Sequence, residues 1–259
     1  MRRTESRRLV VTGGFGRVAG VVVPPLAKNW RIHVIDRSVG DPSFSPERIT
    51  ISDMRDPEPL RRAMRGADAV LHLAANASPW LPWPVAIDNL TLAQNTLDAA
   101  AEESVPTVVL ASSVHAAGGA YREGHVPVAT DRPARPCCHY GTGKAAMEAA
   151  AALHHDATGA GASCLRLGLT GWPLTHRELA DGWLGEADAA ALVRHALSAS
   201  GAGVYHGVSI HGARAWDVNN AARDLGWAPR QELPVPLGSL PALESWPCRM
   251  FSGPRRATT

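Results

Sequence analysis

The sequence predicts an α/β fold in which a doubly wound parallel sheet carries helices on both faces. Two observations indicate this fold. Short apolar segments alternate with helix-like segments through the first two thirds of the chain, a pattern typical of βαβ units whose sheet is covered on both sides. The first apolar segment is also followed at once by a glycine-rich turn that opens a helix. At 259 residues, the chain is long enough for one large α/β domain or two small ones.

The expected elements follow in order along the chain. Pro24 and Pro25 lie in the first expected helix and should kink it or end it early. We expect strands over residues 8–12, 31–36, 48–52, 69–74, 107–112, 162–168 and 203–209. Helices are expected over residues 17–28, 57–65, 89–103, 140–158, 185–200 and 218–225.

Two regions follow from this pattern. Residues 1–168 are expected to bind a dinucleotide and to carry the catalytic groups, and residues 169–259 to form a small substrate-binding region packed on the same domain. Within that second region, the proline- and arginine-rich residues 233–259 are expected to form a loosely packed arm.

The glycine-rich turn has the spacing of a dinucleotide-binding site. Its glycines permit a tight turn and let backbone N–H groups approach a pyrophosphate at the N-terminus of the helix. A lone motif of this kind also occurs in ordinary strand-to-helix turns. The candidate cofactor contacts here are Gly13, Phe15, Gly16, Arg17 and Val18.

Asp36 ends the second expected strand, where a carboxylate accepts hydrogen bonds from the adenine ribose hydroxyls. A carboxylate there would repel a 2′-phosphate, so the sequence favours NAD over NADP. Arg37 follows directly and keeps NADP open as the less favoured alternative. Asp53 and Met54, just past the third strand, are candidates to contact the adenine ring, although an aspartate also suits an ordinary turn.

Tyr140 and Lys144 form the most informative pair in the chain. Lysine occurs only at positions 28 and 144, and tyrosine only at 121, 140 and 205. Residues four apart on a helix share a face, so the phenol and the ammonium can converge on one ligand. A nearby cation favours the phenolate and should lower the pKa of Tyr140 towards the range of a general base.

These residues occur in the order of a known family. With Asp53, the segment His72-Leu73-Ala74-Ala75 and Ser112-Ser113 added, the chain resembles the extended short-chain dehydrogenase/reductase superfamily over about residues 8–230. This resemblance implies a Rossmann-like fold. Segments at residues 111–115, 180–184 and 204–217 look like those of uronate dehydrogenases, which oxidise the anomeric carbon of a hexuronic acid with NAD.

The resemblance implies a role for several residues. Tyr140 would be the general base, Lys144 the ribose-binding residue that depresses its pKa, and Ser113 the hydroxyl that positions the substrate oxygen. Further cofactor contacts would come from Leu73, Ala74, Ala75 and Asn89. Substrate contacts would come from Ser78, Ser113, Val114, His115, Leu169 and Arg177.

Several positions depart from the family pattern. Ala19 replaces the third glycine of the turn, Val114 replaces an asparagine, and Leu169 replaces a serine for which Thr170 is a stand-in. The arginine that pairs with the substrate carboxylate falls on Glu178 in an ungapped match, and Arg177 serves only if the loop shifts by one residue. The departures affect the identity of the substrate more than the chemistry.

Other features limit the partners. The net charge of +2 gives no argument for nucleic acid or an anionic membrane, and no apolar run approaches the length of a membrane span. Four arginines precede residue 9, but glycines then break the apolar stretch, so we expect a cytoplasmic protein. Cys137-Cys138-His139 supplies too few ligands for zinc, so no metal site is predicted.

The sequence therefore predicts an NAD-dependent oxidoreductase that takes hydride from a sugar-derived hydroxyl, in the manner of a uronate dehydrogenase. One alternative is a sugar epimerase or dehydratase that retains its NAD. The other is a dinucleotide-binding regulatory protein without catalysis. The expected partner is a small sugar or sugar acid; a homo-oligomer is compatible with the sequence, which leaves the oligomeric state open.

Overall fold

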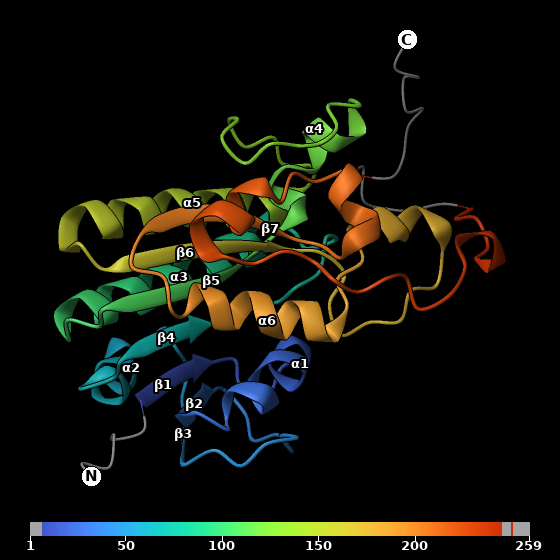
Figure 1. Cartoon of the computed structure of the whole chain (residues 1–259). Helices are drawn as coiled ribbons and strands as arrows, with labels where there is room; N and C mark the ends of the chain where they lie inside the picture. The colour runs from blue at the N-terminus through green and yellow to red at the C-terminus, as the bar shows by residue number, and fades with distance from the viewer. Residues whose placement is uncertain (1–6, 245–249, 251–259) are drawn as a thin grey trace.

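The computed structural model describes residues 7–244 and Met250. It is built on a seven-stranded sheet of order β3-β2-β1-β4-β5-β6-β7, in which every neighbouring pair is parallel (Figure 1). The expectation of a doubly wound parallel sheet is confirmed. The strands are β1 (Arg7–Thr12), β2 (Trp30–Asp36), β3 (Arg48–Ile51), β4 (Ala69–His72), β5 (Thr107–Ser113), β6 (Gly161–Leu167) and β7 (Ala202–Gly207).

Helices cover both faces of this sheet. In Figure 1, α5 and α6 lie on opposite sides of β6, and each shares an apolar core with the helices on its own side. One core joins α1 and α6 to the sheet, and the other joins α2, α3 and α5 to it. The helices are α1 (Arg17–Leu26), α2 (Pro57–Met64), α3 (Trp83–Glu102), α4 (Gly118–Arg122), α5 (His139–Thr158) and α6 (Glu186–Ala196).

The strand order reverses at β1 and β4, which are neighbours although two strands and two helices separate them in sequence. In open parallel sheets, ligands bind in the crevice outside the carboxyl ends of the strands at such a point. Thr12, Asp36, His72 and Ser113 are the last residues of their strands. The fold therefore brings the predicted cofactor and catalytic segments to one edge of the sheet.

Most element boundaries lie within two residues of those predicted, with three informative differences. α3 begins at Trp83 rather than at residue 89, because the prolines at 82 and 84 suit a helix start. The short helix α4 was not predicted. The helix expected over residues 218–225 is present over residues 219–225, but its last turn, Ala221–Leu225, is π-helical.

The C-terminal region completes the same sheet. β7 pairs with β6 in parallel, and α6 packs against α1. The described part of the expected arm is anchored at one residue: Leu240 is buried in a cluster with Leu174, Leu179 and Trp183, whereas residues 234–239 are exposed. The remainder of that arm, residues 245–249 and 251–259, lies outside the described residues.

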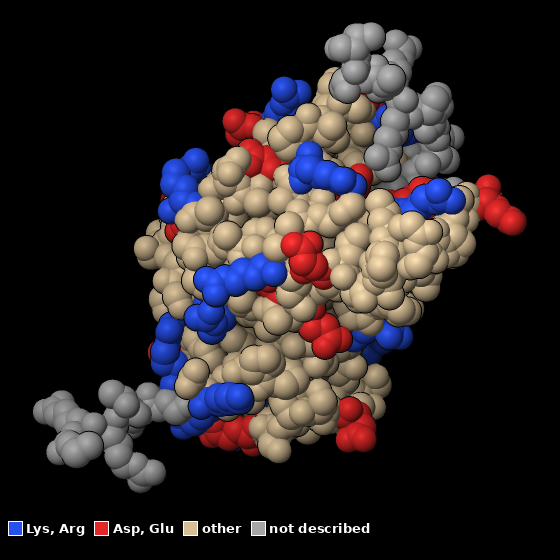
Figure 2. All heavy atoms as spheres, turned by 45° about the vertical axis from the view of Figure 1, so that its right-hand side comes forward, with Lys and Arg blue, Asp and Glu red and all other residues tan. Residues whose placement is uncertain are grey.

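The surface shows no concentration of one charge on the face drawn in Figure 2. Lysine and arginine side chains are interspersed there with aspartate and glutamate across a large uncharged area. Within residues 7–244, no helix combines the length and apolar character needed to cross a membrane.

Two histidines of the sheet, His72 in the central strand β4 and His206 in the edge strand β7, are buried. His72 Nδ1 is 2.9 Å from Thr12 Oγ1 and 3.1 Å from Thr96 Oγ1, and His206 Nδ1 donates to the carbonyl of Asp217 at 3.0 Å. Burial lowers the pKa of His72 to about 3, helped by the charge of Lys144. Burial likewise lowers the pKa of His206 to about 3, helped by Arg166. Both side chains are therefore neutral in the folded protein at neutral and mildly acidic pH.

These histidines should weaken the fold in mild acid. Below pH 6.5 the unfolded chain takes up a proton at His206 and the folded protein does not, so stability falls by about 2 kcal/mol at pH 5. In His206→Asn, the amide retains a donor for the Asp217 carbonyl and this titration is removed. We expect the loss of unfolding free energy between pH 7.5 and pH 5 to be about 2 kcal/mol smaller in the variant.

Urea unfolding at the two pH values measures this difference. Any unfolding free energy that the substitution removes equally at both pH values cancels in the comparison. The same pH dependence in variant and wild type would contradict the prediction.

Candidate active site at the carboxyl ends of the strands

The turn between β1 and α1 is held against the segment that follows β4. Gly13 has a φ of +68°, and a Cβ built on it would lie 2.7 Å from backbone atoms of Ala74. Its N–H donates to the carbonyl of Ile35 at 2.8 Å. Only glycine fits this close approach, and no side chain caps the N-terminus of α1 at Gly16. The turn thus presents backbone N–H groups, as a pyrophosphate site requires.

Asp36 joins this turn to the end of β2. Its carboxylate accepts the N–H of Phe15 at 3.1 Å and that of Arg37 at 2.8 Å, and it remains half-buried. The side chain of Arg37 is exposed. The glycine turn and the carboxylate beside it fit the pyrophosphate and adenosine ribose of NAD.

Other predicted cofactor residues are already engaged within the protein. Met54 is buried in the core under α2 and α3, while exposed Asp53 pairs with Arg55 at 2.9 Å. The amide of Asn89 accepts the backbone N–H of Asn76 at 2.8 Å and donates to its carbonyl at 3.0 Å. Asn89 therefore fixes the segment that follows β4, where Leu73, Ala74 and Ala75 lie half-buried at the expected cofactor edge.

Arg17 spans the crevice from α1. Its guanidinium lies 3.7 Å from the ring centroid of Trp172 and donates to the carbonyl of Gly171 at 3.3 Å. Val18, next on α1, packs against the core instead. Arg17 therefore connects the nucleotide turn to the loop that follows β6.

Tyr140 and Lys144 lie one turn apart at the start of α5, as predicted, and both side chains are buried. The two glycines between them allow α5 to approach its neighbours closely. A Cβ on Gly141 would lie 2.2 Å from the carbonyl oxygen of His115, and one on Gly143 would lie 2.8 Å from that of Ala86. The Tyr-Gly-Thr-Gly-Lys segment therefore combines reactive groups with the backbone contact that places them.

Ser113 completes this group at the end of β5. A hydrogen bond between the side chains of Ser113 and Tyr140 joins the two hydroxyls. The Lys144 ammonium donates to the carbonyl of Ala111 at 2.5 Å, and it lies 5.7 Å from the centroid of the Tyr140 ring. The structure thus brings together the three residues predicted to be catalytic.

Burial dominates the protonation of this group. It raises the pKa of Tyr140 well above its usual value, and the hydrogen bond from Ser113 opposes that change only partly. The sequence-based expectation of a lowered tyrosine pKa is therefore wrong for the protein without ligands. Burial also lowers the pKa of Lys144 to about 8, against the opposing effects of Cys164 and Glu148.

Sequence reasoning missed the buried ion pair beneath these residues. Glu148 accepts two hydrogen bonds of 2.8 Å from Arg166, and it accepts the Ser112 hydroxyl at 2.5 Å. Both side chains of the ion pair are at most 5% exposed. The position of Glu148 could have been predicted from the sequence, because it follows Lys144 by four residues on the same face of α5.

The predicted substrate residues divide into two groups. His115 lies edge-to-face with Tyr140 at 5.9 Å between ring centroids, and Ser78 lies half-buried in the loop after β4. Val114 instead packs into a core cluster, and half-buried Leu169 packs against another. Among these candidates, His115 is the one with a ring contact to Tyr140.

Arg177 and Glu178 lie in the 3₁₀ turn Arg177–Gly182, beyond β6. The carboxylate of Glu178 accepts the backbone N–H of Leu243 at 2.9 Å, so it is held by the C-terminal segment. Arg177 has a side chain that is 55% exposed and lies 3.9 Å from Glu178. Glu178 therefore connects this turn to the C-terminal segment, and Arg177 is the more accessible of the two side chains.

A parallel sheet with a dinucleotide turn at its switch point and a buried Ser–Tyr–Lys group defines a nicotinamide-dependent enzyme. Residues 9–170 match the model of the NAD-dependent epimerase/dehydratase family, and the chain belongs to that family. It is an NAD-dependent oxidoreductase.

Individual relatives cover most of the chain. It is 28% identical to a uronate dehydrogenase of Pseudomonas syringae pv. tomato, over 90% of this chain and 85% of the relative. It is 27% identical to an NAD-dependent glucose-6-phosphate dehydrogenase of Haloferax volcanii, over 86% and 92%. The crystal structure of uronate dehydrogenase from Agrobacterium tumefaciens superimposes with a TM-score of 0.75 at 28% identity, covering 87% and 85% of the two chains. A tyrosine-to-alanine mutant of that enzyme has been solved in complex with NAD.

The buried ion pair gives a stability prediction. Glu148→Gln leaves the Arg166 charge without its partner, and breaking a buried pair in this way costs about 3–5 kcal/mol. The exposed pair between Arg61 and Glu102 is a matched control, because its side chains are 45% and 52% exposed. Glu102→Gln should cost less than about 1 kcal/mol. Urea unfolding of both variants measures the difference, and equal losses would show that the buried pair does not hold α5 on the sheet.

Proposed function

We propose that this protein oxidises a hydroxyl of a small sugar or sugar acid, with Tyr140 as the general base. The observation that carries the proposal is the meeting of Ser113, Tyr140 and Lys144 beside a turn suited to NAD. The relatives named as sugar and uronate dehydrogenases support the substrate class. A cytoplasmic location remains the sequence-based prediction.

Each of the three side chains has a distinct task. When bound, NAD supplies the carbon that accepts hydride from the substrate. Tyr140 takes the proton of the same substrate hydroxyl, which leaves a carbonyl on the sugar carbon. Ser113 donates a hydrogen bond to the oxygen on which negative charge develops. Lys144, fixed by the Ala111 carbonyl, provides the positive charge that favours the phenolate.

The substrate acid would be held by Arg177. Its guanidinium is largely exposed, while the neighbouring Glu178 carboxylate is occupied by the Leu243 backbone. This hydrogen bond holds the Glu178 carboxylate against the C-terminal segment. This arrangement supports hexuronic acids as the first substrates to examine, with neutral aldoses and sugar phosphates beside them.

Tyr140→Phe tests the proposed base. The variant keeps the ring and its packing but has no phenol to accept the proton, so we expect kcat to fall by about 100-fold or more. NAD affinity should remain close to that of the wild type, because the ring itself is retained. Formation of NADH is followed with hexuronic acids, aldoses and sugar phosphates, and NAD binding is measured separately by calorimetry.

Tyr205→Phe is the matched control, since Tyr205 is a buried tyrosine of β7 and not one of the three catalytic candidates. It should keep its activity. Unchanged NADH formation by Tyr140→Phe would overturn the assignment of the base. A wild-type protein that retains stoichiometric NAD and gives no net NADH would indicate the epimerase or dehydratase alternative.

Asp36→Asn tests the choice of cofactor. Asparagine keeps an oxygen to accept the Phe15 N–H but removes the charge that repels a 2′-phosphate. We expect the ratio of kcat/KM for NADP to that for NAD to rise about tenfold, the equivalent of about 1.4 kcal/mol. Asp41→Asn, an exposed carboxylate in the loop after β2, is the control and should leave the ratio unchanged. A ratio that stays constant in Asp36→Asn would show that its charge does not select the cofactor.

A further inference from the structure

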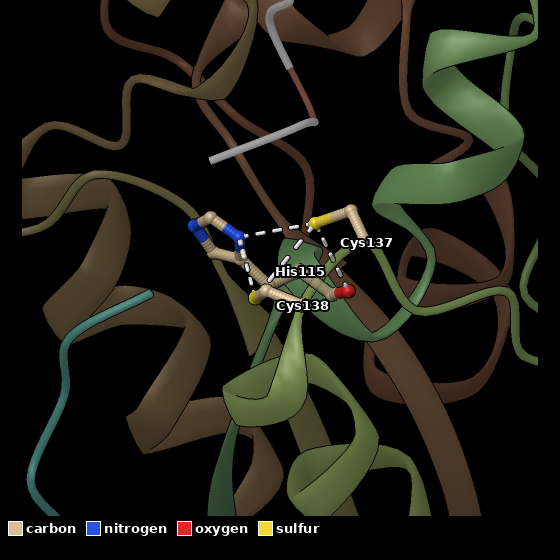
Figure 3. Close-up of side chains that lie close together, drawn as sticks. All are labelled: His115, Cys137 and Cys138. Carbon is tan, nitrogen blue, oxygen red and sulfur yellow. Dashed lines mark hydrogen bonds between the residues drawn. The ribbon is translucent and has the colours of Figure 1, made fainter. Parts of the chain in front are cut away.

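Three side chains that bind soft metal ions meet beside the proposed active site (Figure 3). His115 comes from the 3₁₀ turn after β5, while Cys137 and Cys138 lead into α5. The His115 Nδ1 atom is 3.3 Å from Cys137 Sγ and 3.7 Å from Cys138 Sγ, and the two sulfur atoms are 4.0 Å apart. No local sequence pattern indicates this group, because His115 is 22 positions from Cys137.

These distances match the edges of a tetrahedral zinc site. Zinc bonds of about 2.3 Å to sulfur and about 2.0–2.1 Å to nitrogen place two sulfur ligands about 3.8 Å apart, and a sulfur and a nitrogen ligand about 3.6 Å apart. Each distance in the cluster differs from the corresponding edge by only a few tenths of an ångström. A zinc ion therefore fits between the three atoms with little movement of the side chains.

The backbone around the cluster is fixed. The N–H of Cys137 donates to the carbonyl of His115 at 3.2 Å, and the N–H of His115 donates to Ser113 Oγ at 3.3 Å. A Cβ on Gly118 would lie 2.6 Å from Cys137 Sγ, so a glycine is needed where that thiol packs. The three donor atoms are thus positioned by contacts that do not depend on an ion.

The chemistry of the donors selects the ion. Two thiols and one imidazole suit zinc, whereas magnesium and calcium take oxygen ligands. Cys137 is buried, but His115 and Cys138 are half-buried, which leaves a route for an ion to enter. Three protein ligands with an open fourth position are typical of zinc sites that bind a water molecule or a substrate oxygen.

We propose that His115, Cys137 and Cys138 form a zinc site whose fourth position faces water or substrate. Binding releases the two thiol protons, so that two thiolates and a neutral imidazole nitrogen hold the ion. The site would also fix the orientation of the His115 ring against Tyr140. Zinc would thereby alter the KM for the sugar more than the affinity for NAD, a consequence that rests on the proposed function.

Cobalt(II) and zinc titrations of the full chain under reducing conditions test the site without any substrate. We expect one equivalent of cobalt to give a sulfur-to-cobalt charge-transfer band and the visible bands of tetrahedral cobalt, and zinc to displace it. Magnesium should not displace it. No stoichiometric binding of either ion would overturn the proposal, as would a cobalt spectrum without thiolate bands.

Cys138→Ser is the decisive variant. Cys138 caps α5 by accepting the Gly141 N–H at 3.4 Å, and serine is itself a favoured cap, so the helix start is preserved. We expect its zinc affinity to fall by about 100-fold or more, because a thiolate ligand is lost, with an unchanged circular dichroism spectrum. Cys164→Ser is the control, because Cys164 is a buried thiol of β6 outside the cluster; it should bind zinc as the wild type does.

Equal zinc affinity in Cys138→Ser and the wild type would overturn the assignment of ligands. Activity assays with and without zinc then address the link to catalysis. Because metal binding is measured without sugar or NAD, a failed dehydrogenase assay leaves the test of the site intact. A zinc effect on KM that persists in Cys138→Ser would overturn the proposed link.

Discussion

The arrangement of the active site depends on one interaction, the buried ion pair between Glu148 of α5 and Arg166 of β6. Desolvating a carboxylate and a guanidinium is costly unless both are well paired, so neither partner can leave the other without a large penalty. Tyr140, Lys144 and Glu148 follow one another at intervals of four on a single face of α5. Fixing the third of these residues against β6 therefore fixes the height and rotation of the first two at the edge of the sheet.

This close packing has an electrostatic consequence for the reacting groups. The burial that positions Tyr140 and Lys144 disfavours their charged forms, raising the pKa of the phenol and lowering that of the ammonium to about 8. The protein alone therefore holds the proton on Tyr140. Loss of this proton, which gives the phenolate, is favoured by the hydrogen bond from Ser113 and, in the proposed mechanism, by the positive charge of Lys144. The packing that fixes the position of Tyr140 therefore also keeps its phenol protonated.

The sequence predicted the turn after β1 and the carboxylate at the end of β2 because these signals are local. Gly13 and Asp36 act through the backbone turn and strand end on which they lie, and the spacing of Tyr140 and Lys144 is a property of one helix. The ion pair between Glu148 and Arg166 was not predicted, because the two side chains meet only when α5 packs on β6. His115 was predicted as a substrate contact, yet its approach to Cys137 depends on how the turn after β5 meets the start of α5. Local periodicity carries no information about such contacts between distant segments.

The same distinction explains why the chemistry is better defined than the substrate. The hydroxyls and the ammonium of the proposed catalytic group come from β5 and α5, whose positions follow from strand pairing and the buried ion pair. The residues that would select the sugar lie in turns and loops: Val114 packs inward, Glu178 binds the C-terminal backbone, and Arg177 extends towards solvent. Changes in such segments alter the contacts offered to a substrate without moving α5. His115 is the exception, because its backbone is tied to Ser113 while its ring faces both Tyr140 and the two cysteines. In the proposed function, the turn after β5 would therefore link the contacts to substrate, the metal site and the proton-accepting tyrosine.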